Sequence, residues 1–162
     1  MEIKVTREGE GMTLTATVHA PVNPRVAWAV ITDFDRMAGW VPNLQESRIV
    51  SGLGERPLRV AQRGVKRVGL LTFPFESVRA IELAPIKTIK AKGLSGNMRK
   101  LESTTRVSAE GGGTRLEYRL EFIPSFWVPP LIGPALIKRE SRLQFEAMID
   151  EMVRRRQSEN SK

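Results

Sequence analysis

The sequence has no cysteine and only one histidine, His19, among its 162 residues. Without cysteine it can form neither disulfides nor thiolate metal sites, a composition typical of cytoplasmic proteins. A histidine metal site would need carboxylate ligands as well, so we expect neither a metal nor a cofactor. His19 falls on the threonine face of an expected strand, which favours a surface role over that of a general base. No Ser-His-Asp arrangement can be proposed either, so we predict no catalytic residues.

Long apolar runs are also missing. No stretch approaches the roughly 18 apolar residues of a membrane-spanning helix, and no basic-then-apolar leader opens the chain. The apolar fraction of 41% is nevertheless ordinary for a folded protein. We expect residues 1–162 to form one domain with a substantial core, located in the cytoplasm, with peripheral membrane association as a further interpretation.

Acidic residues are fewer than basic ones, 18 against 26, which gives a formal net charge of +8. Such an excess is typical of proteins that bind nucleic acid or anionic membranes, although an arginine-rich soluble surface gives the same balance. The charges are spread along the chain, and only Arg154–Arg156 form a cluster. Aromatic residues make up just 6% of the chain and fall mostly at apolar positions, which argues against nucleic acid as a partner.

The first third of the chain predicts a short strand that begins at Ile3 and Val5, a second strand, and two short helices. Residues 12–20 alternate between apolar side chains and threonines, the pattern of a half-buried strand. Asn23 and Pro24 mark the start of the first helix, with Asn23 as the cap and Pro24 in the first turn. Asp33 or Asp35 is placed to cap the second short helix.

Most of the remaining chain predicts strands. Residues 44–123 contain five or six alternating, turn-bounded segments, with Pro74 marking an edge or a bulge. A turn is expected at residues 93–97. The longest run without a helix breaker covers residues 135–156, where we predict a long C-terminal helix. Strands grouped apart from helices indicate an α+β protein, in which a curved antiparallel sheet of six to seven strands surrounds this helix.

Three parts of the chain resemble a known family. The first is residues 20–28 with 32–43, which begin Ala-Pro-Val-Asn-Pro and Thr-Asp-Phe-Asp. The others are residues 112–118, Gly-Gly-Thr-Arg-Leu-Glu-Tyr, and residues 126–134, Phe-Trp-Val-Pro-Pro-Leu-Ile-Gly-Pro. Their order and spacing resemble the SRPBCC superfamily, the helix-grip fold of START-like lipid binders. Within it the chain is most similar to the polyketide cyclase/dehydrase and coenzyme Q-binding group, over about residues 12–155.

The resemblance implies a cavity between sheet and helix that holds a hydrophobic small molecule, such as a lipid, a quinone or an aromatic polyketide-like compound. The side chains that we predict to line it are Val60, Gln62, Phe75, Arg99, Leu101, Ser103, Thr105, Tyr118, Leu120, Phe122, Phe126, Trp127, Ser141, Phe145 and Met148. Taken singly, aromatic and methionine residues of this kind are more often ordinary core, and the prediction of a cavity rests on their grouping and on the resemblance. Where the group has Gly-x-Trp, this chain has Ser103-x-Thr105, which predicts a larger and more polar wall.

Three functions remain open. The first is a non-enzymatic carrier or sensor of the hydrophobic ligand. The second is a cyclase or dehydratase of a polyketide-type substrate in the same cavity, a reaction that positioning can promote without a recognisable catalytic motif. The third is an interaction module bound to the ribosome or to RNA. The oligomeric state stays open as well.

The proline-rich segment Ser125–Pro134 predicts either a lid over the core or a loop that contacts anionic membranes. In the second case, vesicles containing anionic lipid should blue-shift the tryptophan fluorescence, and Trp127→Ala should remove much of the shift. Binding should weaken as salt is added, because salt screens the attraction between the lipid and the net charge of +8. Absence of binding at low salt, or binding that is indifferent to Trp127, would leave only the lid.

Overall fold

A computed structural model describes residues 1–68, 70–125 and 133–160. Within these ranges one antiparallel sheet of eight strands has the order β1-β2-β8-β7-β6-β5-β4-β3. The strands are β1 (Glu2–Glu8), β2 (Gly11–Ala20), β3 (Leu44–Ile49), β4 (Leu58–Val68), β5 (Leu71–Ala84), β6 (Thr88–Gly96), β7 (Met98–Glu110) and β8 (Gly113–Pro124). The helices are α1 (Pro24–Ile31), the 3-10 helix η1 (Phe34–Gly39) and α2 (Gly133–Asn160). None of these helices is long and apolar enough to cross a membrane.

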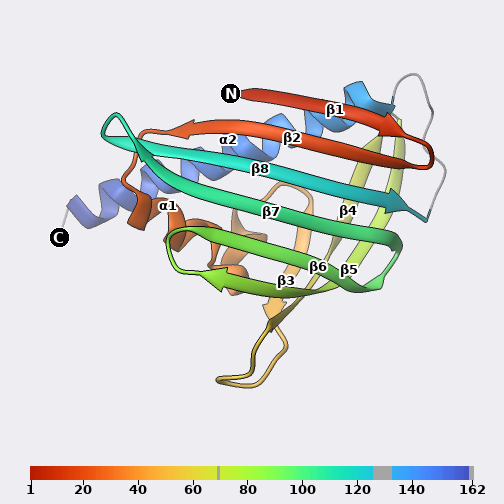
Figure 1. The fold of residues 1–162 in the computed structure, drawn as a ribbon, viewed down its shortest axis with the longest axis horizontal. Coiled ribbons are helices and arrows are strands. Elements are labelled where there is room, and N and C mark those ends of the chain that lie inside the picture. Colours follow the sequence, from red (N-terminus) through yellow and green to blue (C-terminus); the bar gives the residue numbers. More distant parts are fainter. Residues whose placement is uncertain (69, 126–132, 161–162) are drawn as a thin grey trace.

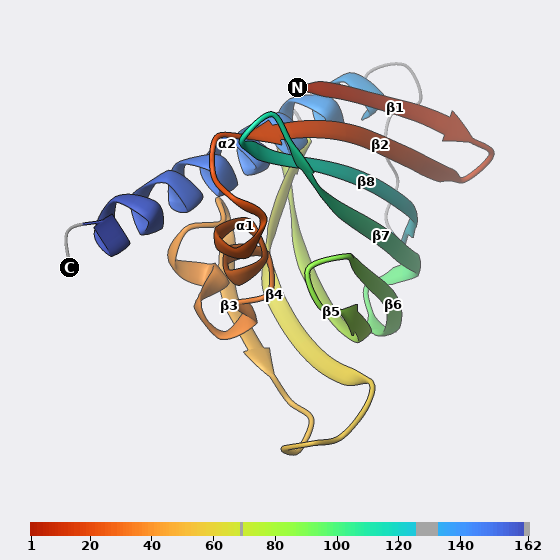
Figure 2. The ribbon, with the colours of Figure 1, turned by 60° about the vertical axis from the view of Figure 1, so that its left-hand side comes forward.

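The sheet is strongly curved, and both α-helices lie on its hollow side (Figure 1). In Figure 2 the strands turn from β1 and β2 at the top to β3 and β4 below, with α1 and α2 between the two ends. Side chains of β2, β8 and α2 share one core, which includes Leu14, Val18, Leu116, Met148 and Met152. This arrangement confirms the α+β helix-grip fold that the sequence predicts.

The sheet has eight strands, where the sequence predicts six to seven. The short N-terminal strand predicted from Ile3 and Val5 is confirmed. It pairs with β2 along its whole length, from Glu2 opposite Thr17 to Glu8 opposite Gly11. Backbone pairing therefore makes a complete edge strand of a segment with only two apolar strand residues.

Two sequence predictions concern interruptions of the long strands, at Pro74 and at residues 93–97. Pro74 lies in β5 at the end that β6 does not reach, since β5–β6 pairing begins at Ser77 opposite Gly96. Its missing N–H therefore disrupts no ladder on that side, which confirms the expected edge position. The turn predicted at residues 93–97 is wrong, because β6 continues to Gly96 before the chain reverses.

The first helix begins as predicted, with the Asn23 Oδ1 accepting a hydrogen bond from the Val26 N–H at 3.0 Å. The cap prediction for the second helix is wrong. Asp33 occupies the N-cap position of η1 but makes no side-chain cap hydrogen bond. The Asp35 carboxylate instead accepts a hydrogen bond from the Ile49 N–H at 2.7 Å, which ties η1 to β3.

An ion cluster fastens the C-terminal half of α2. The Arg155 guanidinium lies 2.9 Å from both the Asp33 and the Glu151 carboxylates, and Arg154 also pairs with Glu151. Glu151 is only 8% exposed. The hydrogen bond from Arg154 lowers the pKa of the Glu151 carboxyl, a second from Arg155 lowers it as well, and burial opposes both. The ionised form of Glu151 is therefore favoured in the folded protein.

Replacing Glu151 by Gln should lower the free energy of unfolding by about 1–3 kcal/mol at neutral pH, because two arginines lose a charged acceptor. The folded-state pKa lies below the ordinary value of 4.5, so this contribution is complete above that value. It should disappear as the pH falls through the folded-state pKa. Urea denaturation of Glu151→Gln and wild type across this pH range measures the effect.

The matched control is Glu146→Gln, at an exposed position of the same helix. It should change the free energy of unfolding by less than about 0.5 kcal/mol. A Glu151→Gln effect that stays constant down to low pH would contradict the ionic explanation.

Candidate functional site

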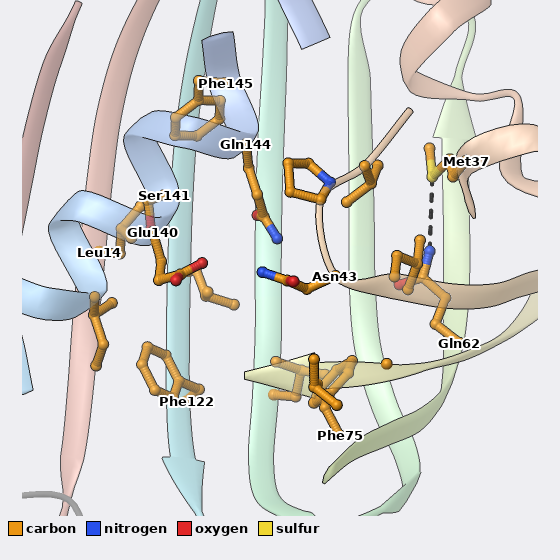
Figure 3. Close-up of a pocket in the computed structure, with 18 of the residues that line it drawn as sticks. Leu14, Met37, Asn43, Gln62, Phe75, Phe122, Glu140, Ser141, Gln144 and Phe145 are labelled. Atoms are coloured by element: carbon orange, nitrogen blue, oxygen red, sulfur yellow. Dashed lines mark hydrogen bonds between the residues drawn. The ribbon is translucent and has the colours of Figure 1, made fainter. Parts of the chain in front are cut away.

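A cavity of about 320 Å³ lies between the sheet and the N-terminal half of α2. Its apolar lining residues are Leu14, Met37, Trp40, Val41, Pro42, Leu44, Val65, Phe75, Met98, Leu101, Leu120, Phe122, Pro124, Ile137, Phe145 and Met148. Within this lining the rings of Tyr118 and Phe145 meet edge-on, with centroids 5.7 Å apart and planes at 76°. Figure 3 shows Phe145 and Ser141 on α2, facing Leu14 and Phe122 of the sheet. Apolar walls of this kind are usual in pockets for small molecules.

A chain of polar side chains interrupts the apolar wall at β4 and β5. Arg79 donates a hydrogen bond through Nη2 to the Gln62 Oε1 at 2.9 Å. Gln62 donates in turn through Nε2 to the Ser47 Oγ at 3.1 Å and to the Met37 Sδ at 3.6 Å. Figure 3 shows the contact between Gln62 and Met37 as a dashed line. The Gln62 amide is therefore held with its oxygen toward Arg79.

Arg79 and Tyr118 line the cavity and influence each other's ionisation. Burial lowers the pKa of the Arg79 guanidinium because the charged form loses hydration, while Tyr118 raises it. Burial raises the pKa of the Tyr118 phenol, against the lowering effects of the Arg79 charge and of a hydrogen bond with Ser103. Arginine stays protonated in proteins, so the wall carries a positive charge beside a neutral phenol.

The segment between η1 and β3 forms another wall of the cavity, with residues 40–44 all in the lining. Asn43 adopts a left-handed backbone conformation with φ of 64°. Its carbonyl accepts a hydrogen bond from the Val65 N–H at 3.0 Å. A Cβ on Gly64 would collide with the same carbonyl oxygen, so glycine permits this close approach. Gln144 of α2 points toward Asn43 across the cavity (Figure 3).

Residues 12–157 match the protein family described as polyketide cyclase / dehydrase and lipid transport. The chain belongs to this family. No curated protein matches the sequence.

Solved structures share the fold of this chain at low sequence identity. A START superfamily protein from Mycobacterium smegmatis is 16% identical, with 88% of this chain and 97% of that chain covered and a TM-score of 0.73. The Zhui aromatase/cyclase from a Streptomyces species is also 16% identical, with 90% of this chain and 95% of that chain covered and a TM-score of 0.69. Similarity at such low identity shows that the fold is shared, but it does not show that the activity is shared.

In this member of the cyclase/dehydrase family, many residues predicted to line the cavity do so. They are Gln62, Phe75, Leu101, Tyr118, Leu120, Phe122, Ser141, Phe145 and Met148. The alternation of the strands and the spacing along α2 place these side chains on facing surfaces. Their contact with a ligand stays a prediction. Phe126 and Trp127 lie outside the described residues.

Three further predicted residues lie outside the lining that the described residues form. Val60 is fully buried in the core. Thr105 pairs with Tyr118 in the β7–β8 ladder without reaching the cavity, and Ser103 hydrogen-bonds the Tyr118 side chain. Ser103 lies opposite Leu120 on the same face of the sheet, beside the lining, where its hydroxyl supports Tyr118.

The predicted inward position of Arg99 is corrected by the structure. Its side chain is exposed and pairs with Glu10 at 2.7 Å. A register shift between Met98 and Lys100 interrupts the β7–β8 ladder at this point. A bulge adds one residue to the strand, so the alternation read back from Leu101 does not extend to Arg99.

Sequence analysis missed Arg79 and the segment between η1 and β3. A signal for Arg79 was present, because Phe75, Ser77 and Ile81 are buried and share its alternation along β5. The segment at residues 40–44 has no apolar period that would place it against a cavity. Its position depends on the contact with Gly64, which lies distant in the sequence.

Other candidate groups lie apart from the cavity. The His19 Nδ1 is 3.4 Å from the Glu110 carboxylate, and both side chains are about half exposed. Neither residue belongs to the cavity lining. In the part of the chain that the structure describes, no three His, Asp or Glu side chains are placed to hold a metal ion.

Replacing Gly64 by Ala should displace the Asn43 segment and lower the free energy of unfolding by about 1–3 kcal/mol, because the added methyl group meets a backbone carbonyl. Urea denaturation measures the loss. Gly39→Ala is the matched control, since a Cβ at Gly39 meets nothing within 4 Å. Its effect should stay below about 1 kcal/mol. Equal effects of both substitutions would show that the close approach at Gly64 does not matter.

Proposed function

We propose that the protein is a carrier or sensor that holds a hydrophobic small molecule between its sheet and α2. The observation that carries this proposal is the cavity of about 320 Å³, whose walls are apolar apart from a few polar side chains. Its volume lies in the range of about 300–1,000 Å³ that ligand pockets occupy. Membership of a family that includes lipid transport supports the same function. A composition without cysteine supports a cytoplasmic location.

The second candidate is a cyclase or dehydratase that acts on a polyketide-type substrate in the same cavity. The neutral Tyr118 phenol beside the charged Arg79 favours it, because both groups can hydrogen-bond the oxygens of a folded ketone chain. The similarity in fold to an aromatase/cyclase is consistent with this candidate. Incubation with a polyketide-type substrate distinguishes the two, since a carrier leaves the substrate unchanged.

Ser141→Trp should block the cavity, because Ser141 lines it from α2 and an indole would occupy part of its limited volume. We expect the affinity for Nile red, a neutral apolar dye, to fall at least about tenfold. Dye fluorescence measures the affinity, and circular dichroism checks that the variant folds.

The matched control is Leu143→Trp, two residues along the same helix at a position that is 46% exposed. It should bind Nile red like the wild type. If Ser141→Trp folds and also binds the dye unchanged, the cavity is not the binding site.

Native mass spectrometry of the purified wild type is a separate experiment, which can identify a ligand carried from the cell.

A further inference from the structure

The cavity wall contains a positive charge for which the described residues supply no negative partner. The Arg79 Nε is buried and makes no hydrogen bond. The Nη2 of the same side chain donates to the neutral amide of Gln62 at 2.9 Å. No carboxylate of the described residues acts on the ionisation of Arg79. Arg79 as a whole is half-buried, and a charge in such a position is unfavourable without a partner, so the arrangement points to a missing anion.

The environment of Arg155 shows that the chain can supply acidic partners for a half-buried arginine. The Arg155 side chain is 21% exposed and lies 2.9 Å from the carboxylates of both Asp33 and Glu151. Arg79 has no equivalent pair among the described residues, although its Nε is buried. The unbalanced charge is therefore a local property of the cavity wall.

The neighbours of Arg79 hold it in place. Gln62 uses its Nε2 to donate to Ser47 and Met37, which leaves its oxygen to accept from Arg79. One edge of the guanidinium is thereby fixed, while the Nε remains unused. A binding group fixed in this way loses little freedom when a ligand arrives.

We propose that Arg79 binds the carboxylate of an amphiphilic ligand, such as a fatty acid, whose apolar body occupies the rest of the cavity. This inference rests on the proposed function, because it names the class of molecule that the same site holds. The guanidinium presents a planar fork of N–H groups that matches the two oxygens of a carboxylate. Phe75, Leu120 and Phe122 supply apolar walls for the chain.

The balance of charge favours a carboxylate over a phosphate. Arg79 and Arg67 are the basic residues in the lining that the described residues form, and Arg67 is exposed. Glu140 is the acidic residue of the same lining, and it does not act on the ionisation of Arg79. The single charge of the half-buried Arg79 matches that of a carboxylate, whereas a phosphate monoester carries close to two at neutral pH. The neutral Tyr118 phenol, which also lines the cavity, can add a hydrogen bond without adding charge.

The test compares dodecanoate with dodecan-1-ol, which differ only in the head group, by displacement of Nile red at neutral pH. We expect the wild type to bind the acid about ten- to a hundredfold more tightly than the alcohol, as for hydrogen bonds to charged groups. Arg79→Met should abolish this preference and keep the affinity for the alcohol. Removal of an unpaired buried charge should leave the variant folded.

Arg106→Met is the matched control, since Arg106 is exposed and does not belong to the cavity lining. It should keep the preference for the acid. Arg67→Met tests the other arginine of the lining, and the inference expects the preference to survive there as well. Arg79→Lys keeps the charge without the planar fork and should give an intermediate preference for the acid. If Arg79→Met fails to fold, the affinities of the wild type for dodecanoate and dodecan-1-ol still test the inference.

Several outcomes would overturn the inference. Equal affinity of the wild type for acid and alcohol would overturn the inference and leave the proposed function intact. A preference for the acid that is lost in Arg67→Met and kept in Arg79→Met would overturn it as well. Tighter binding of dodecyl phosphate than of dodecanoate would exclude a carboxylate as the preferred head group. Failure of Nile red and of both twelve-carbon compounds to bind would reject the proposed function together with this inference.

Discussion

The buried side chains of α2 lie in its second half, and the cavity depends on this asymmetry. Met148 and Met152 are buried among side chains of β2 and β8, and the ion cluster of Asp33, Glu151 and Arg155 fastens the same half. At the start of the helix, Leu136 and Ile137 pack against Met12 and Phe122 of the sheet, and the turns in between line the cavity. An α-helix keeps its backbone hydrogen bonds along its whole length and behaves as a rod. Contacts toward both ends therefore hold the turns between them across the hollow of the curved sheet.

The remaining walls are built from features that do not favour folding by themselves. Asn43 has a left-handed backbone, and Gly64 gives up a side chain so that the Asn43 segment can approach β4. Empty volume forfeits packing contacts, and the unpaired charge of Arg79 opposes burial. Strained or unfavourable groups persist where the surrounding structure holds them, and they gather at functional sites. Their concentration around one cavity supports the view that this cavity is the working part of the molecule.

The accuracy of sequence-based prediction followed the strength of the apolar pattern. Residues 12–20 alternate cleanly, and Leu14 indeed faces the core opposite Leu120 of β8. A bulge leaves no mark in such a pattern, so the alternation predicts the wrong side for Arg99. The neighbours of Asp33 in sequence predict a cap, whereas its carboxylate pairs with Arg155 in the last helix. The alternation of β5 predicts an inward Arg79, but an inward charge contradicts the usual rule for strands.

Fold and ligand choice depend on different residues in this protein. A solved structure with 16% identity and a TM-score of 0.73 has the same fold, so most residues can differ without a change of fold. The chemistry of the cavity depends on a few polar side chains at inward positions, chiefly Gln62, Arg79 and Tyr118. One such substitution changes what the cavity can bind and leaves the register of the strands unaltered. Members of one family can therefore include carriers and enzymes, and the charge inside the wall says more about this protein's ligand than its fold does.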